Sequence, residues 1–312
     1  MATQHSVGAL DLAVQHASPR IRGGALRVLG DYWALTKPEV NFLILVTTFA
    51  GFYLAPATGP GGFKILPIFH TLLGTLLVAS GTGTLNQYVE RVFDSQMRRT
   101  ARRPVASGRI ESSHALWFGI SLSLAGTVYL ALAVSVLASL LALATLLSYL
   151  FLYTPLKRKT PLCTLIGAFP GAVPPLIGWV AARGRVDPEA WVLYAMVFLW
   201  QFPHFMAIAW MYREDYTRAG YLVLPLDERR DRYVVWQSLG VSLALVPMSL
   251  IPTIIGESGL VYSVGALILG LIFFYYSARF AFHRSNVAAR QLLAASIVYL
   301  PAVFTLLILN KK

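Results

Sequence analysis

The sequence predicts an all-α integral membrane protein. Of its 312 residues, 56% are hydrophobic and only 13% carry a charge, which is more apolar than an ordinary soluble domain. The mean hydropathy is +0.62, and several long stretches of the chain lack Lys, Arg, Asp and Glu. Most of these stretches have the roughly 20 residues that a helix needs to cross a bilayer. They are continuous apolar runs without the period-two alternation of membrane strands, which excludes a β-barrel.

Nine membrane-spanning helices are expected. The first begins beside Trp33 and runs to Ala55. Residues 112–156 form one charge-free stretch of 45 residues, which as a single helix would be about 67 Å long. Because the hydrocarbon core is only about 30 Å thick, this stretch must fold back, near Ala133–Leu137. The other expected spans are Ile65–Val89, Thr160–Ala182, Ala190–Tyr212, Tyr233–Gly256, Ser258–Ala278 and Gln291–Asn310.

The positive charges predict an orientation with the N-terminus inside and the C-terminus outside. In that orientation 21 of the 26 Lys and Arg residues lie on the cytoplasmic side, in agreement with the positive-inside rule. The net charge of +12 is then explained by topology, and no nucleic-acid partner is expected because the basic residues are spread over short loops. We expect residues 1–31 to be a cytoplasmic segment and residues 32–312 to be one nine-helix domain. The short N-terminus favours a bacterial inner membrane.

The acidic residues concentrate on the predicted cytoplasmic side. A transporter needs polar groups near the middle of the bilayer and access from both faces. Here the external loops are short, and the carboxylates gather at one mouth, which favours an enzyme that faces the cytoplasm. Of the 14 carboxylates in the chain, the following nine all lie on the cytoplasmic side: Glu39, Glu90, Asp94, Glu111, Glu214, Asp215, Asp227, Glu228 and Asp231.

The segment that begins at Asn86 is the strongest candidate for a ligand site. Asn86, Glu90 and Asp94 are four residues apart, so a helix places their oxygen side chains on one stripe. Mg²⁺ typically takes one or two carboxylates together with phosphate oxygens and water, and the arginines that follow can form bidentate phosphate contacts. The pattern predicts a site for a metal-bound diphosphate. The alternative is a solvated helix end at which Glu90 and Asp94 pair with Arg91 and Arg98.

A second candidate segment reads YTPLKRKTP, with Tyr153 and Lys157 four residues apart and Arg158 beside them. The segment is also compatible with an ordinary cytoplasmic loop, in which the positive charges only set the membrane orientation and the tyrosine lies at the membrane interface.

The sixth expected span ends in a third polar segment, WQFPHFMAIAWMYREDY. His204 lies inside the lipid, about three helical turns from the carboxylates at the mouth, and could reach a second substrate. The alternative is a buried histidine bonded to a carbonyl that Pro203 leaves free.

Together these segments resemble the UbiA-type membrane prenyltransferases, and within them the protohaem IX farnesyltransferases. The resemblance covers nearly the whole chain, through LTKPEV, RRTARRP, YTPLKR, WQFPHFMAIAW with YREDY, and SIVYLP. It implies nine helices around a central cavity that opens to the cytoplasm. The implied reaction transfers the farnesyl group of farnesyl diphosphate to a vinyl group of haem B, with addition of water, and yields haem O and diphosphate. Mg²⁺ is the implied cofactor, and haem A synthase or a terminal oxidase assembly is an implied partner.

The resemblance also implies residue roles. The expected catalytic residues are Asn86, Glu90, Asp94, Lys157 and Asp215, and all of these except Lys157 are expected metal ligands. The expected substrate-binding residues are Arg99, Thr100, Arg103, Tyr153, Arg158, Trp200, Gln201, His204, Tyr212 and Tyr216.

For His204 the expectation is a haem contact, either as an axial ligand or as a hydrogen bond to a propionate. The chain departs from the superfamily pattern at two points. Glu90 stands where aspartate is common, and Tyr212 and Tyr216 hold the spacing of the two aspartates of the second motif.

Two other functions remain open from the sequence. A prenyltransferase for an aromatic quinone precursor would use the same diphosphate-binding residues. A non-enzymatic haem or lipid carrier would need an apolar cavity but no metal-diphosphate site.

Overall fold

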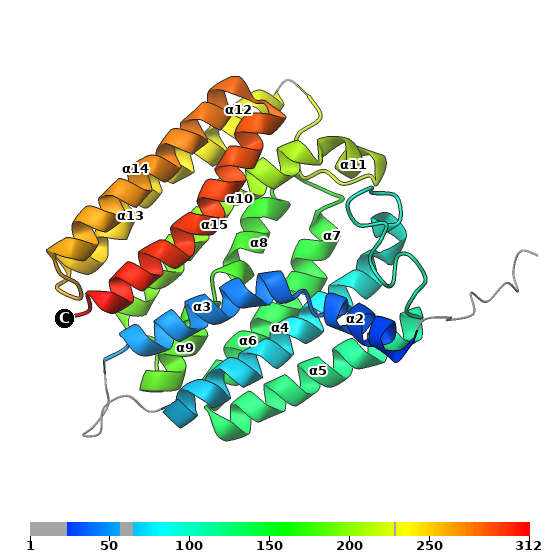
Figure 1. The fold of residues 1–312 in the computed structure, drawn as a ribbon, viewed down its shortest axis with the longest axis horizontal. Helices are drawn as coiled ribbons and strands as arrows, with labels where there is room; N and C mark the ends of the chain where they lie inside the picture. Colours follow the sequence, from blue (N-terminus) through cyan, green and yellow to red (C-terminus); the bar gives the residue numbers. More distant parts are fainter. Residues whose placement is uncertain (1–23, 57–64, 228) are drawn as a thin grey trace, which may run out of the picture.

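The computed structural model describes residues 24–56, 65–227 and 229–312, and over these residues all the long elements of regular structure are helices. This confirms the all-α part of the predicted fold. Two groups of long helices lie on opposite sides of the molecule (Figure 1). One group contains α4 (Ile65–Asp94), α5 (Ser112–Ala133) and α6 (Val136–Ser148), and the other contains α13 (Val241–Ile254), α14 (Leu260–His283) and α15 (Asn286–Leu309).

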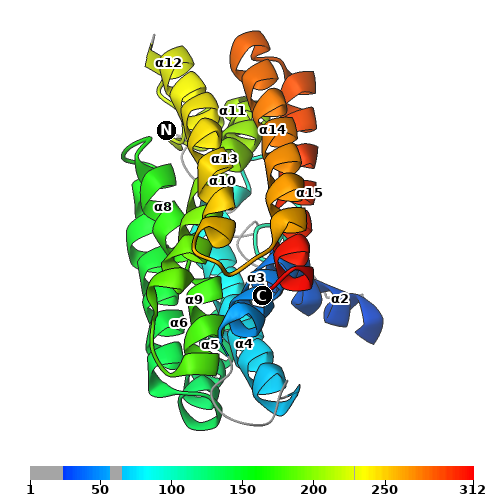
Figure 2. The same cartoon turned by 90° about the vertical axis from the view of Figure 1, so that its left-hand side faces the viewer.

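Shorter and connecting helices join the two groups. The helix α10 packs against α13 and α15, and α8 and α9 pack against both α10 and α6. Figure 2 shows α8 and α9 on the side of α6, and α10 on the side of α13. The helix α6 continues through a π-helical turn (η1, Tyr149–Tyr153) into α7 (Thr154–Leu156). The remaining elements are α2 (Ala25–Leu35), α3 (Pro38–Leu54), α8 (Cys163–Gly171), α9 (Pro174–Arg183), α10 (Pro188–Met211), α11 (Arg213–Arg218), α12 (Arg229–Val235) and η2 (Trp236–Gly240).

Eight helical segments of the described chain are long and apolar enough to cross a membrane, and α3 is a shorter apolar helix of 17 residues. Their outer surfaces are apolar, as lipid contact requires. Leu132, Ile254 and Phe282 are among the large hydrophobic side chains that are mostly exposed. Such a surface would be an aggregation hazard in water and is stable in a bilayer.

The first expected span begins at the wrong residue. Trp33 belongs to α2, and α3 begins only at Pro38. The helix breaks here because proline has no amide hydrogen and disfavours the α conformation in the residue before it. Lys37 adopts a left-handed conformation, with φ 54° and ψ 62°. Asn41 donates a hydrogen bond to the carbonyl of Thr36 at 2.8 Å, which stabilises the turn.

The predicted fold-back in residues 112–156 is confirmed. α5 ends at Ala133 and α6 begins at Val136. Ser135 caps α6 because its Oγ accepts a hydrogen bond from the amide of Ala138 at 3.1 Å.

Backbone contact between α3 and α9 holds the N-terminal half together. A Cβ on Gly51 would lie 2.0 Å from the carbonyl oxygen of Pro175, and a Cβ on Gly178 would lie 1.9 Å from that of Thr48. Only glycine allows the two helices to approach so closely at these two points. The crossing fixes α3, and therefore also Lys37 at its start.

The predicted cytoplasmic segment 1–31 lies mostly outside the described residues, which begin at Gly24. Its last part belongs to α2, which exposes Leu26, Leu29 and Trp33 and packs Leu35 against the protein.

Candidate active site

The three oxygen side chains of the predicted stripe, Asn86, Glu90 and Asp94, are all buried on α4, and we call them the oxygen stripe. Figure 1 shows the end of α4 near α7, α11 and the loop that follows α4. Asn86 is 1% exposed, and its Oδ1 accepts a hydrogen bond from the ammonium of Lys37 at 2.7 Å. Its Nδ2 lies 3.4 Å from the hydroxyl of Thr154 on α7. Asn86 therefore joins the start of α3 to the start of α7.

Lys37 was not among the residues expected from the sequence. Its left-handed backbone directs the side chain into the protein, and a non-glycine residue in this conformation costs roughly 1–2 kcal/mol. Burial, and then the charge of Arg103, lower the pKa of Lys37 to about 7. The sequence held a signal for this residue, since a lysine directly before the proline that opens a helix lies at a forced turn.

Glu90 forms a buried ion pair with Lys157. Glu90 Oε1 and Lys157 Nζ are 2.8 Å apart, and the two side chains are 6% and 13% exposed. The ammonium also lies 4.5 Å from the ring centroid of Tyr153. Burial is the largest single effect and acts to lower the pKa of Lys157, but the Glu90 carboxylate together with Tyr153 and Tyr149 raises it well above its ordinary value.

Asp94 is paired on one oxygen only. Its Oδ2 accepts a hydrogen bond from Arg103 Nη1 at 2.7 Å, and its backbone carbonyl accepts one from the hydroxyl of Thr100 at 3.0 Å. Within the described chain its Oδ1 is buried without a hydrogen-bond partner. An unpaired buried carboxylate oxygen is costly, and it points to a cation or a donor at this position.

The donor set suits one magnesium ion that shares its coordination with phosphate oxygens. Asn86, Glu90 and Asp94 supply the oxygen ligands that Mg²⁺ prefers. The described residues contain no group of three or more His, Cys, Asp or Glu that would hold a metal by themselves. The remaining coordination positions of a metal at this site would be open to phosphate oxygens and water.

Asp215 fastens two loops together. Its Oδ2 accepts the backbone N–H of Arg99 at 3.2 Å, and its Oδ1 accepts a hydrogen bond from Arg218 at 3.0 Å. The guanidinium of Arg99 lies 5.0 Å from the ring centroid of Tyr212 and donates to the hydroxyl of Tyr216 at 3.3 Å. Of the expected second motif, the structure therefore gathers all three residues around Arg99.

Tyr221 is a second residue that the sequence reasoning missed. In the part of the chain that the structure describes, its hydroxyl is buried without a hydrogen-bond partner, and burial raises its pKa. Its ring lies 6.0 Å from the Lys157 ammonium and 5.8 Å from the ring of Phe93. The guanidinium of Arg158 stacks on the ring of Phe93, with its Cζ 4.4 Å from the ring centroid.

Trp200 and His204 form a separate cluster with Ser296 of α15. The indole of Trp200 donates to the carbonyl of Ser296 at 2.8 Å, and His204 Nδ1 lies 2.8 Å from the Ser296 hydroxyl. Gln201 points elsewhere, toward α8, where its Nε2 donates to the carbonyl of Ala168 at 3.1 Å. We call Trp200, His204 and Ser296 the histidine cluster.

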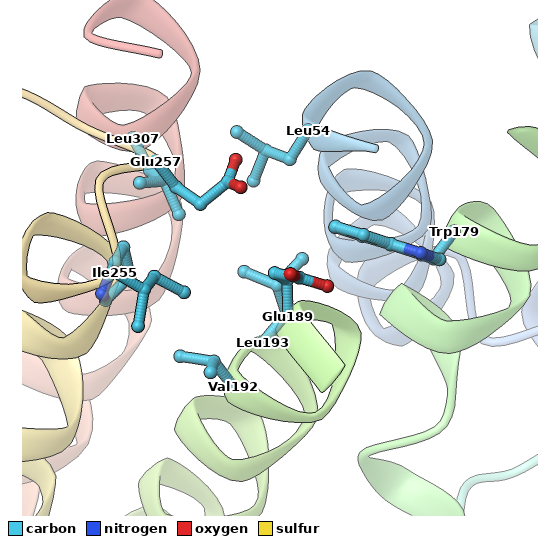
Figure 3. Close-up of a pocket in the computed structure, with 9 residues that line it drawn as sticks. Leu54, Trp179, Glu189, Val192, Leu193, Ile255, Glu257 and Leu307 are labelled. Atoms are coloured by element: carbon cyan, nitrogen blue, oxygen red, sulfur yellow. The ribbon is translucent and has the colours of Figure 1, made fainter. Parts of the chain in front are cut away.

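A small pocket lies at the opposite end of α10. Figure 3 shows the carboxylates of Glu189 and Glu257 there among apolar side chains such as Leu54 and Leu193. Its volume of about 20 Å³ has room for a water molecule. Because Glu189 is in the first turn of α10 and Tyr212 follows its last, this pocket is distinct from the oxygen stripe.

The comparison with protein families decides what kind of protein this is. The model described as "UbiA prenyltransferase family" matches residues 44–304, from α3 to α15. The chain belongs to the UbiA prenyltransferase family. The family match therefore includes the oxygen stripe, Lys157, the histidine cluster and Asp215.

Within the UbiA family the chain is similar to proteins named protoheme IX farnesyltransferase. It is 47% identical to the one from Solibacter usitatus over 287 residues, which cover 90% of this chain and 98% of that protein. It is 40% identical to the one from Koribacter versatilis over 297 residues, which cover 93% and 96%.

Solved structures of UbiA proteins share the fold. A digeranylgeranylglyceryl phosphate synthase superimposes with a TM-score of 0.71 at 18% identity, covering 90% of this chain and 98% of that one. A UbiA homologue from Archaeoglobus fulgidus bound to GPP and Mg²⁺ gives a TM-score of 0.62 at 16% identity, covering 89% and 99%.

Proposed function

We propose that this chain transfers the farnesyl group of farnesyl diphosphate to a vinyl group of haem B and adds water, which gives haem O and diphosphate. The farnesyltransferase relatives, at 47% and 40% identity over nine-tenths of the chain, support the reaction. The observation that carries the site assignment is the half-paired Asp94 beside three cations that each face an oxygen of α4. This arrangement suits a ligand that brings both a metal and negative charge.

The diphosphate would bind where the three cations now meet α4. Asn86, Glu90 and Asp94 would hold Mg²⁺, which neutralises charge on the leaving group when it is bound. Lys37 and Lys157 would turn from their present partners to the phosphate oxygens. The homologue from Archaeoglobus fulgidus was solved with GPP and Mg²⁺ bound. That structure supports the binding of a prenyl diphosphate together with this ion in the family.

The basic loop after α4 would bind the same diphosphate. Arg103 and Arg99 supply guanidinium groups, and Thr100 fixes the turn between them through the Asp94 carbonyl. We assign Asp215 the task of positioning Arg99, because both of its oxygens already accept hydrogen bonds. The metal-ligand role expected of Asp215 stays a prediction.

The reaction breaks the C1–O bond of farnesyl diphosphate, the π bond of the vinyl group and one O–H bond of water, and it forms one C–C bond and one C–O bond. The C1–O bond of farnesyl diphosphate breaks as negative charge grows on the leaving diphosphate, and the lysines and arginines stabilise that charge. C1 then bonds to the outer carbon of the vinyl group. Water adds to the inner vinyl carbon and releases one proton. The aromatic residues Tyr153, Tyr212 and Tyr216 would shield the farnesyl cation from earlier attack by water.

Haem B would bind on the side of the histidine cluster. Trp200 and His204 supply an aromatic surface there, and we include Gln201 as the residue that holds α10 against α8 beside them. His204 precedes Tyr212 by eight residues, about 12 Å along a helix, which is compatible with a porphyrin between the two clusters. Arg158 completes the proposed substrate contacts next to Phe93.

We further propose the membrane arrangement that the sequence predicts. α3 would be the ninth span, residues 32–312 would form one domain, and a central cavity would open to the cytoplasm. The positive charges support an N-in, C-out orientation. The location would be a bacterial inner membrane, with haem A synthase or a terminal oxidase assembly as the partner that receives haem O.

The direct test is mass spectrometry of the haems extracted after membranes with this protein are incubated with haem B, farnesyl diphosphate and Mg²⁺. A haem that carries a hydroxyethylfarnesyl group, absent after the metal is chelated, is the expected product. Prenylation of an added aromatic acid in place of haem would overturn the haem assignment and keep the diphosphate site. Haem binding without any prenyl transfer would identify a carrier.

A further inference from the structure

The hydroxyl of Ser296 has two neighbours in the structure and only one hydrogen to share between them. Its Oγ lies 2.6 Å from the carbonyl oxygen of Leu293 and 2.8 Å from His204 Nδ1. A carbonyl oxygen can only accept, so the short contact to Leu293 requires the hydroxyl hydrogen. Ser296 Oγ is then the acceptor for His204, and the hydrogen of that second bond must come from Nδ1.

We propose that Ser296 holds His204 in the neutral tautomer with its proton on Nδ1, and that Nε2 therefore presents a lone pair as a ligand for the iron of haem B. Ser296 is a positioning residue, and His204 is the residue that contacts the substrate. The inference rests on the proposed function for the identity of the ligand, but the tautomer follows from the contacts of Ser296 alone.

The surroundings fix the orientation of the imidazole as well as its tautomer. The indole of Trp200 stacks on it, with ring centroids 4.9 Å apart and an interplanar angle of 27°. The same indole donates to the Ser296 carbonyl, so α15 and both α10 side chains form one unit. Phe205 makes an edge-to-face contact with the imidazole, with ring centroids 5.6 Å apart. A ring held this way cannot readily turn to exchange its two nitrogens.

The tautomer distinguishes the two roles that the sequence left open for His204. A hydrogen bond to a haem propionate would need an N–H, and the one N–H of the neutral ring is used on Ser296. In the described chain Nε2 has no hydrogen-bond partner. A neutral imidazole nitrogen with a free lone pair is a common iron ligand, and a hydrogen bond from the other nitrogen is the usual way to fix it.

The tautomer is tested first, without haem. The full-length protein is labelled with ¹⁵N-histidine, placed in lipid nanodiscs and measured by solid-state NMR, and the His204 signals are assigned by their loss in His204→Gln. We expect a protonated Nδ1 and an unprotonated Nε2 in the wild type and in Ser296→Thr. We expect the proton to move to Nε2 in a large fraction of Ser296→Ala. A wild-type signal with the proton on Nε2 would overturn the proposal.

Ser249→Ala is the matched control. Ser249 is also fully buried, and its hydroxyl also donates to a carbonyl three residues before it, that of Val246 at 2.7 Å. Ser249→Ala therefore removes the same kind of hydrogen bond, from a serine hydroxyl to a carbonyl one turn earlier in its helix, at a place outside the histidine cluster. The His204 signals should be unchanged in this variant, and a shift equal to that in Ser296→Ala would contradict a specific role for Ser296.

The ligand is tested by titration of the same proteins with ferric haem B, followed by visible absorption and electron paramagnetic resonance. We expect an imidazole-ligated spectrum in the wild type and Ser296→Thr, its loss in His204→Gln, and about tenfold weaker haem binding in Ser296→Ala. An unchanged spectrum in His204→Gln would overturn ligation while leaving haem as the substrate. A wild type that binds no haem but shows the Nδ1 tautomer would refute the proposed function and the ligand, and would leave Ser296 as the residue that sets the tautomer.

Discussion

The oxygen stripe of α4 and the histidine cluster of α10 and α15 satisfy their polar atoms in opposite ways. On α4 the three oxygen side chains each face a cation, at 2.7 to 2.8 Å. In the histidine cluster, the bonds join neutral groups, namely an indole, an imidazole, a hydroxyl and two carbonyls. A charged ligand can replace the partners of the charged groups on α4. The neutral hydrogen bonds of the histidine cluster instead hold its side chains in one geometry.

This difference matches what each substrate demands. A metal-bound diphosphate brings its own positive and negative charges, so each cation of the site can move to phosphate while each oxygen moves to the metal. Because both sets of charges are buried, removal of one member leaves an uncompensated charge, which is strongly unfavourable. Haem brings an iron and an apolar face, for which a fixed neutral nitrogen beside aromatic rings is suitable.

The largest effect is expected from Asp94→Asn. The substitution removes the charge on the oxygen that has no partner, and with it most of the affinity for the metal-bound diphosphate. Turnover to the farnesylated haem should fall about a thousandfold. Asp187→Asn is the control, because Asp187 accepts from Trp179 Nε1 at 3.0 Å at the opposite end of α10. Equal losses in the two variants would show that the loss of any hydrogen-bonded carboxylate has this effect, and would break the comparison.

A smaller effect is expected from Lys37→Met. A hydrogen bond from a charged group to a ligand contributes about 2 kcal/mol, so Mg²⁺-diphosphate should bind about 30-fold more weakly. Calorimetry on the protein in nanodiscs measures this affinity directly. Haem binding should not change, because Lys37 faces Asn86 and not the histidine cluster. An unchanged diphosphate affinity would restrict Lys37 to holding Asn86.

The pH dependence sharpens the assignment of Lys37. Burial lowers the pKa of Lys37 to about 7, so the side chain is mostly charged below pH 7 and mostly neutral above it. Diphosphate favours the charged form, and binding above pH 7 must first take up a proton. Between pH 6.5 and 8.5 the wild type should therefore lose about tenfold in affinity relative to Lys37→Arg, whose charge does not titrate. Parallel profiles would contradict this assignment.

Sequence patterns predicted the parts of the site that one helix supplies. Asn86, Glu90 and Asp94 share a face because their spacing matches the helical repeat. Their partners are distant in the chain, since Lys37 is 49 residues from Asn86 and Ser296 is 92 residues from His204. Such contacts depend on how helices pack, which local periodicity does not encode.

The same limit explains what the sequence missed in the fold. Hydropathy located the apolar helices and the turn before Val136, because both are local properties. Hydropathy did not separate α2 from α3, because the apolar side chain of Trp33 in α2 lies only a few residues before the break at Lys37 and was counted with the apolar run of α3. The metal-binding role that the motif position gave Asp215 stays a prediction, and in the structure this carboxylate accepts hydrogen bonds from Arg99 and Arg218.

The smallest effect is expected from Gly167→Ala. The added Cβ would lie 2.5 Å from Cδ2 of Tyr153 and would push this ring away from the Lys157 ammonium. A cation–π contact of this kind contributes about 0.5–1 kcal/mol, so turnover should fall roughly two- to fivefold. Gly30→Ala is the control, because a Cβ on Gly30 meets nothing within 4 Å. A loss of turnover in Gly30→Ala as large as in Gly167→Ala would remove Tyr153 from the explanation.

The most direct test of two separate clusters is to measure the binding of each substrate to Asp94→Asn and to His204→Gln. Calorimetry with Mg²⁺ and diphosphate and visible titration with haem B give the two affinities for each variant. The account predicts that Asp94→Asn loses diphosphate binding and keeps haem binding, and that His204→Gln does the reverse. Loss of both substrates in either variant would contradict the separation of the charged and neutral clusters.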